Sequence, residues 1–336
     1  MSAPQEPDLG VELPVSTTTR AGWITGGVLL LTLALLAARY GESQRFLDLA
    51  QRARPVWLGA ALALQVATYA CAAGVWQRSL RRSGSTLRVR DLLPLGLAKL
   101  FADQALPSAG LSGTALVLRS LRGRGVPRGM AITAMLVGLV SFYIAYAIAV
   151  ALALALLARL GEVHGAMLAL AGLFALLAAG VPLAVFWLRG RAAERLPRFL
   201  LGLPLVRETL AAIADAPPGA LFSLRLGAET TSLQLAIFAL DAATLAVMLH
   251  ALVTPVAPEL VFASFVVASL VATLAWVPGG LGTFEGTCVA MLHVHGVELE
   301  AAVGATLLLR GFTFWLPMAP GLWIARHEML RRPPGS

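Results

Sequence analysis

The amino-acid sequence predicts an all-α polytopic integral membrane protein with about seven to eight transmembrane helices and two Pro/Gly-broken re-entrant segments. Hydrophobic residues other than glycine make up 58% of the 336 residues, and charged residues make up 13%. Soluble domains have about 45–50% apolar residues with glycine included and about 25% charged residues. The mean hydropathy is +0.79. The apolar residues also form runs close to the ~20 that a helix needs to cross about 30 Å of hydrocarbon.

Seven apolar runs are predicted to cross the bilayer, and two further segments are apolar but broken. The predicted crossings are Gly22–Ala38, Val56–Trp76, Met130–Leu157, His164–Leu188, Gly227–Leu252, Pro258–Val277 and Val297–Ile324. The broken segments are Leu92–Leu118 and Gly279–His295. We expect a disordered cytoplasmic N-terminus over 1–21, one membrane domain over 22–325 and a short basic tail over 326–336. The connection 189–225 is predicted to be cytoplasmic, with either a helix lying on the membrane surface or a solvated loop helix.

The net charge of +8 comes almost entirely from arginine, because Lys99 is the one lysine among 26 basic residues. A basic balance is compatible with nucleic acid binding, but these arginines flank apolar runs. Anionic lipid headgroups are therefore the predicted partners, and nucleic acid is not. Arginine is enriched in cytoplasmic connections. Its distribution here is most uneven if each broken segment enters and leaves on one side, which predicts re-entrant segments and a cytoplasmic N-terminus.

The two broken segments share a motif, "PSAGLSGT" in the first half of the chain and "PGGLGT" in the second. Paired Pro/Gly interruptions of this kind are typical of the binding site of a transporter built from a pseudo-symmetric repeat. Irregular backbone at membrane depth must be buried in protein or line a wet cavity, and a helix that starts there offers N–H groups to an anion. Close packing of small residues is the alternative explanation. The residues predicted to shape the site are Pro107, Ser108, Gly110, Ser112, Gly113, Pro278, Gly279, Gly280 and Gly282.

Charged residues inside or beside these apolar runs are further candidates, because ionisable groups at membrane depth usually face a cavity or a partner. Lys99 and Asp103 are four residues apart and are predicted to pair on one helix face. Arg310 is predicted to pair with Glu285 or with Asp241. An internal salt bridge that only holds helices together is the alternative for each. Arg119, after the first broken segment, is predicted either to reach a headgroup phosphate or to mark the interface.

The stretches 103–127 ("DQALPSAGLSGTALVLRSLRGRGVP") and 278–286 ("PGGLGTFEG") resemble the two signature regions of the lysylphosphatidylglycerol synthase transmembrane family, also described as flippase-like. The resemblance covers residues 22–325, nearly the whole chain. It implies a bacterial cytoplasmic (inner) membrane protein that moves a phospholipid between leaflets. In the full synthases a soluble aminoacyl-transferase domain follows. Ten residues follow Arg326 here, so we expect a stand-alone membrane domain that does not carry out tRNA-dependent lysylation.

Two functional classes follow from these features. The first is a protein that binds an anionic lipid headgroup between the broken segments and translocates it. The second is a membrane enzyme, or an accessory subunit of a separate lipid-modifying enzyme. Catalysis needs a nucleophile with an activating base, but no histidine follows Ser108, and His293 and His295 would point to different helix faces. We therefore favour binding and translocation, and predict no catalytic residue, metal site or cofactor.

Overall fold

The computed structural model describes residues 55–105, 111–188, 223–252, 256–275 and 280–330. Within these ranges every regular element is a helix, and five helices are long and apolar enough to cross a membrane. The predicted class, an all-α polytopic membrane protein, is confirmed. The predicted crossing Gly22–Ala38 and nearly all of the connection 189–225 lie outside the described residues.

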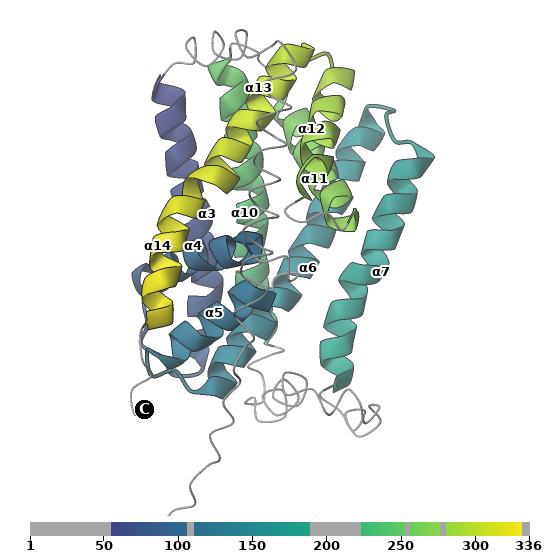
Figure 1. Cartoon of the computed structure of the whole chain (residues 1–336). Helices are drawn as coiled ribbons and strands as arrows, with labels where there is room; N and C mark the ends of the chain where they lie inside the picture. The colour runs from purple at the N-terminus through teal and green to yellow at the C-terminus, as the bar shows by residue number, and fades with distance from the viewer. Residues whose placement is uncertain (1–54, 106–110, 189–222, 253–255, 276–279, 331–336) are drawn as a thin grey trace, which may run out of the picture.

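Long helices run the length of the bundle and account for five of the predicted crossings (Figure 1). They are α3 (Pro55–Arg82), α6 (Arg128–Arg159), α7 (Gly165–Leu188), α10 (Leu224–Ala251) and a composite of α13 (Leu299–Arg310), η3 (Gly311–Trp315) and α14 (Leu316–Leu330). At 1.5 Å per residue, even the 24 residues of α7 span roughly 36 Å, more than the hydrocarbon thickness. Each of these helices can therefore cross the bilayer.

The two ends of the bundle differ in charge. One end holds the end of α3 and the starts of α6 and α10, and we call it the arginine-rich end because it carries Arg81, Arg82, Arg122, Arg128 and Arg225. The opposite end, the acidic end, carries Glu162, Glu259 and Glu298. The uneven distribution of arginine inferred from the sequence is therefore present in the described part of the chain.

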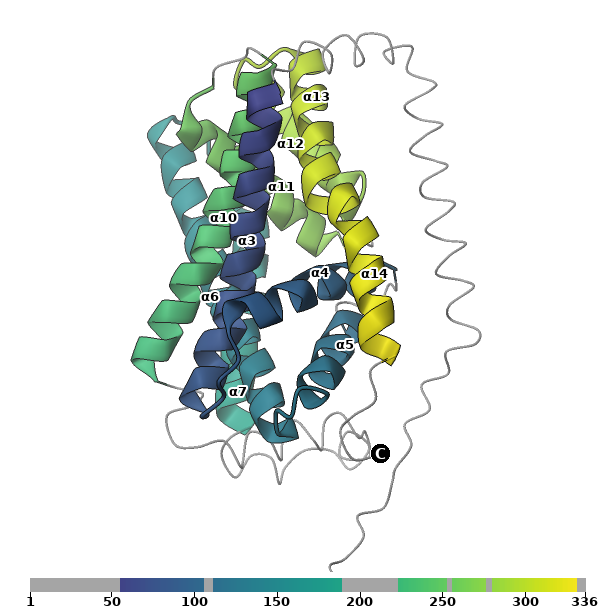
Figure 2. The same ribbon diagram turned by 90° about the vertical axis from the view of Figure 1, so that its left-hand side faces the viewer.

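Two short helix pairs enter the bundle from opposite ends without crossing it (Figures 1 and 2). The first hairpin, α4 (Val89–Ala105) and α5 (Leu111–Arg122), enters from the arginine-rich end and returns to it. The second hairpin, α11 (Pro258–Leu274) and α12 (Thr283–Val294), occupies the opposite half and opens at the acidic end. The helices of each pair pack on each other. In chain order, each broken motif thus falls at the junction of the two arms of a hairpin, and the two hairpins have inverted directions.

One predicted crossing was wrong. Pro258–Val277 was expected to cross, with Gly279–His295 as a separate re-entrant segment. The helix ends at Leu274 after 17 residues, which is roughly 26 Å and shorter than the hydrocarbon layer. It forms the first arm of the second hairpin, so α14 ends at the arginine-rich end rather than at the opposite one (Figure 1).

The core follows from composition: apolar side chains fill the space between α3, α6, α10 and α11. Its two largest fully buried side chains are Tyr146 and Phe174, whose ring centroids lie 4.4 Å apart, and the Phe238 ring lies 4.8 Å from that of Tyr146. Leucines on the outer faces of α6 and α7 stay exposed; Leu176, for example, is 74% exposed. Exposed leucine is unfavourable in water but is the expected lipid-facing surface of a membrane helix.

Candidate functional site

A charged cluster closes the first hairpin. Lys99 Nζ and Asp103 Oδ2, four residues apart on α4, form the predicted ion pair. The second carboxylate oxygen, Asp103 Oδ1, accepts a hydrogen bond from the backbone N–H of Gly113 at 2.8 Å. Ser112 Oγ donates to the carbonyl of Ala102 at 2.7 Å. Asp103 therefore links the end of α4 to the start of α5, where backbone N–H groups have no partner within the helix.

The close approach of the two arms depends on glycine. A Cβ added at Gly113 would lie 2.6 Å from both Asp103 Cγ and the carbonyl oxygen of Lys99. These separations are well below the ordinary van der Waals distance between heavy atoms, about 3.5 Å or more. The glycine of the "LSGT" motif is thus explained by packing and by access of the Asp103 carboxylate to the backbone.

The second hairpin has a matching carboxylate at the start of α12. Glu285 Oε2 accepts a hydrogen bond from the backbone N–H of Gly282, the N-cap residue, at 2.6 Å. Gly280 and Gly282 have φ values of +63° and +81°, in the left-handed region that glycine adopts without steric cost. A Cβ at Gly280 would also lie 2.8 Å from Ala272 Cβ on the other arm. Gly280 and Gly282 therefore allow the tight turn that precedes α12 and the close approach of this turn to α11.

Arg310 pairs with the second hairpin from the end of α13. Its Nε donates to Glu285 Oε1 at 2.6 Å, and the two side chains are only 14% and 15% exposed. The guanidinium carbon lies 4.5 Å from the ring centroid of Phe284 and 5.4 Å from that of Phe314. An Nη also donates to the Gly280 carbonyl at 3.3 Å. Of the two predicted partners of Arg310, Glu285 is therefore the one confirmed.

The backbone changes form directly after Arg310. The five residues of η3 are wound as a π-helix, a local widening that is frequent at functional sites. Further along the same composite helix, Gly321 packs against the first hairpin: a Cβ there would lie 2.7 Å from the Leu97 carbonyl oxygen and 2.8 Å from Phe101 Cβ. One helix thus carries the cation of the second hairpin and contacts the first hairpin.

Asp241 belongs to a different polar group. Its Oδ1 accepts hydrogen bonds from Gln65 Nε2 at 3.1 Å and from Thr68 Oγ1 at 3.4 Å, both on α3. Gln65 also donates to Thr244 Oγ1 at 3.0 Å. These neutral donors stabilise the carboxylate within the α3–α10 pair. The predicted alternative in which Asp241 pairs with Arg310 is therefore wrong, because Asp241 contacts Gln65 and Thr68 instead.

The remaining predicted site residues divide into two groups. Arg119 lies exposed on α5, and its role at a headgroup stays a prediction. The others lie outside the described residues: Pro107, Ser108, Gly110, Pro278 and Gly279. Whether the two motif tips share one cavity therefore stays a prediction as well.

Sequence reasoning missed the neutral partners Gln65 and Thr68 and the aromatic neighbours Phe284 and Phe314. A signal was available for the first pair, because a glutamine and a threonine three residues apart share one face of an otherwise apolar helix. Phe284 adjoins Glu285 in sequence, but its ring contact with Arg310 depends on how two helices are rotated.

The described residues contain no group of three His, Cys, Asp or Glu side chains arranged to hold a metal ion. His293 Nδ1 lies 2.9 Å from the Val297 carbonyl, whereas His295 Nε2 lies 2.5 Å from Glu162 Oε2. The two histidines thus engage different partners.

Comparison with known families identifies the family of this chain. The family model of the lysylphosphatidylglycerol synthase TM region matches residues 22–321. The chain belongs to this family. Its members are membrane proteins involved in lipid handling, so the two hairpins and their charge clusters lie in a lipid-handling membrane domain. A search of curated proteins found no match.

Proposed function

We propose that this member of the family binds the headgroup of an anionic phospholipid, or of a lipid-linked anion, and moves it between leaflets. The observation that carries the proposal is Arg310, a cation that is 14% exposed, faces the second hairpin and belongs to a helix that also packs on the first. A buried, unneutralised guanidinium is costly, so Glu285 acts as its counter-ion when no ligand is bound.

Arg310 can exchange one hydrogen-bond acceptor, the Glu285 carboxylate, for another, the phosphate of a lipid. A lipid phosphate, like a carboxylate, can accept paired N–H···O hydrogen bonds from a guanidinium. As a phosphate approaches Arg310, it takes over the role of the Glu285 carboxylate, which still caps α12 through the Gly282 N–H. The headgroup thereby crosses the apolar layer beside a fixed positive charge, while the acyl chains remain in lipid.

The inverted hairpins support alternating access. Each reaches into the bundle from a different end and has its own charge pair: Lys99 with Asp103 within the first hairpin, and Glu285 of the second hairpin with Arg310 of α13. A headgroup can thus meet a polar group from either leaflet. Because arginine is enriched on cytoplasmic faces, we assign the arginine-rich end and the N-terminus to the cytoplasm of a bacterial inner membrane. A separate enzyme that modifies the lipid is a compatible partner.

Leaflet exchange in proteoliposomes tests the proposal. The assay follows fluorescent phosphatidylglycerol, with dithionite quenching the outer leaflet, for Glu285→Gln and Arg310→Ala. Matched controls are Glu298→Gln and Arg326→Ala, which remove equivalent groups from exposed positions. We expect both site variants to lose at least about tenfold in rate, since a buried guanidinium or its counter-ion contributes more than the 1.4 kcal/mol that corresponds to tenfold. Wild-type exchange by both site variants, with normal incorporation and helicity, would refute the assignment.

A further inference from the structure

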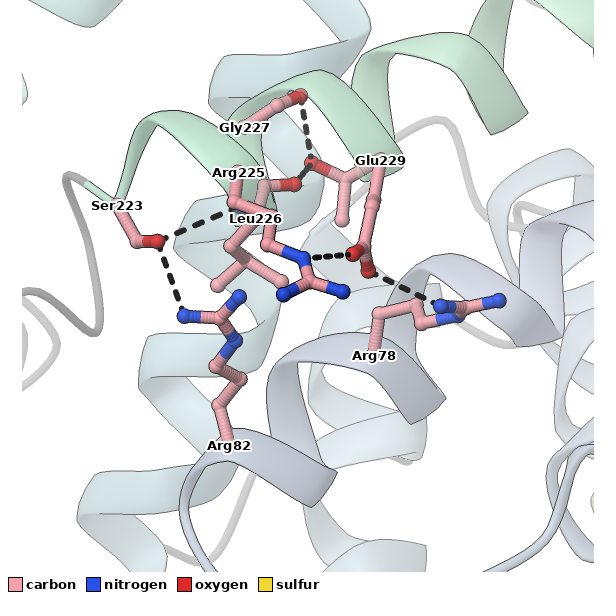
Figure 3. A network of polar contacts seen from close by, with 8 residues as sticks. Arg78, Arg82, Ser223, Arg225, Leu226, Gly227 and Glu229 are labelled. Carbon is pink, nitrogen blue, oxygen red and sulfur yellow. Dashed lines mark hydrogen bonds and ion pairs between the residues drawn. The ribbon is translucent and has the colours of Figure 1, made fainter.

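Four arginines surround a hollow at the arginine-rich end, away from both hairpin clusters. The hollow has a volume of about 300 Å³ and is lined by Arg78, Arg81, Arg82, Arg225 and Glu229. Three of these arginines come from the last turns of α3 and the fourth from the first turn of α10. Figure 3 shows Arg78 and Arg82 of α3 facing Arg225 of α10. Two helices that are distant in sequence thus bring their basic ends together.

Glu229 is the one carboxylate among the lining residues that the structure describes, and two arginines share it. Its Oε2 accepts from Arg78 Nη1 at 3.0 Å and its Oε1 from Arg225 Nε at 3.2 Å (Figure 3). Arg82 Nη1 donates instead to a neutral oxygen, Ser223 Oγ, at 3.0 Å. Within the described part of the chain, the five lining residues therefore carry four positive charges and one negative charge.

This excess of charge is not needed to join the helices. One ion pair would connect α3 to α10, and exposed pairs contribute only about 0–1 kcal/mol. Every additional guanidinium repels its neighbours unless an anion accompanies it. The side chains also remain accessible, with Arg78 47% and Arg225 83% exposed. Several N–H donors are therefore available for a ligand with oxygen acceptors.

The position of the hollow indicates the source of that anion. It lies where α3 ends and α10 begins, at the border of the apolar layer. Leu224, next to Arg225, is 92% exposed. A fully exposed leucine beside a basic hollow is typical of a membrane interface, where the apolar chain meets acyl groups and the arginines meet headgroups.

We infer that the hollow between Arg78, Arg81, Arg82 and Arg225 binds the phosphate of an anionic phospholipid from the leaflet at the arginine-rich end. The site is separate from Arg310, and the inference does not depend on translocation. Paired N–H donors from two helices would hold one phosphate, and Glu229 competes with it for Arg78 and Arg225.

Direct binding by the full chain tests this inference. Radiolabelled phosphatidylglycerol, with phosphatidylcholine as the zwitterionic reference, is titrated onto purified protein in detergent. The test variant replaces Arg78, Arg81, Arg82 and Arg225 with glutamine. The matched control replaces four other exposed arginines at the same end, namely Arg88, Arg90, Arg122 and Arg326.

We expect the test variant to bind phosphatidylglycerol on the order of a hundredfold more weakly, and the control within about threefold of wild type. Glu229→Gln releases two guanidiniums and should bind about fivefold more tightly. Equal losses of affinity in the test and control variants would show that binding depends only on general surface charge, and would overturn the inference. Equally tight phosphatidylcholine binding, or displacement of the lipid by millimolar inorganic phosphate, would overturn its assignment to an anionic lipid. This titration measures binding and not transport, so a negative result would not affect the proposal for Arg310.

Discussion

The contact between the arms of the first hairpin allows a stability prediction for Gly113→Ala. The added Cβ would lie 2.6 Å from Asp103 Cγ and from the Lys99 carbonyl oxygen, so the arms must separate. Overpacking of this kind costs about 1–3 kcal/mol. Separation also weakens the 2.8 Å hydrogen bond from Gly113 N to Asp103 Oδ1, which contributes up to about 1.5 kcal/mol for a carboxylate that is still 21% exposed. We expect a total loss of about 3 kcal/mol.

Unfolding of the purified protein in mixed detergent–SDS micelles, followed by tryptophan fluorescence, measures this loss. Gly172→Ala is the matched control, because Gly172 lies inside α7 and a Cβ there meets nothing within 4 Å. That control should be neutral or more stable by up to about 1 kcal/mol, since alanine favours the helix. A Gly113→Ala protein as stable as the control would refute the close approach of α4 and α5.

Two further predictions concern the hydrogen bonds of Asp241 and the membrane topology. Asp241→Asn keeps a carbonyl oxygen for Gln65 and Thr68, so unfolding in the same micelles should change by less than about 1 kcal/mol, whereas Asp241→Leu removes the acceptor and should cost about 1–3 kcal/mol. A loss of several kcal/mol in Asp241→Asn would show that the negative charge itself is required. In a variant whose two native cysteines are replaced by serine, Glu298→Cys and Arg326→Cys should react with an impermeant maleimide from opposite sides of the membrane, because they lie at opposite ends of the bundle. Labelling of both from one side would refute the crossing of the bilayer by the composite helix of α13, η3 and α14.

Local contacts of the candidate site could be predicted from sequence, because they are set by spacing along one helix or across one turn. Lys99 and Asp103 are four residues apart, and the glycines around Glu285 mark a helix start. The pair between Glu285 and Arg310 was one of two alternatives. Choosing between them requires the rotation of α12 and α13 about their own axes, which one sequence does not specify.

The error at Pro258–Val277 has a physical cause. The apolar run is long enough to span the bilayer only if Ala275 to Val277 continue the helix. The helix ends at Leu274, and the chain returns as α12. Hydropathy does not distinguish a crossing from an apolar arm buried in protein, because both avoid water. The partners of Asp241 were missed for a related reason: Gln65 and Thr68 lie 176 and 173 residues away in sequence.

The composite helix that ends the described chain makes the two hairpins mechanically dependent on each other. Arg310 and Gly321 are separated by eleven residues, roughly 16 Å of helix rise, with η3 between them. A π-turn holds one residue more than an α-turn, so rewinding η3 as α-helix would turn α14 by roughly 100° relative to α13. Gly321 would then lose its contact with α4, whereas Arg310 would keep its ion pair with Glu285. The five residues of η3 therefore determine how α14, which contacts the first hairpin, is rotated relative to α13, which contacts the second.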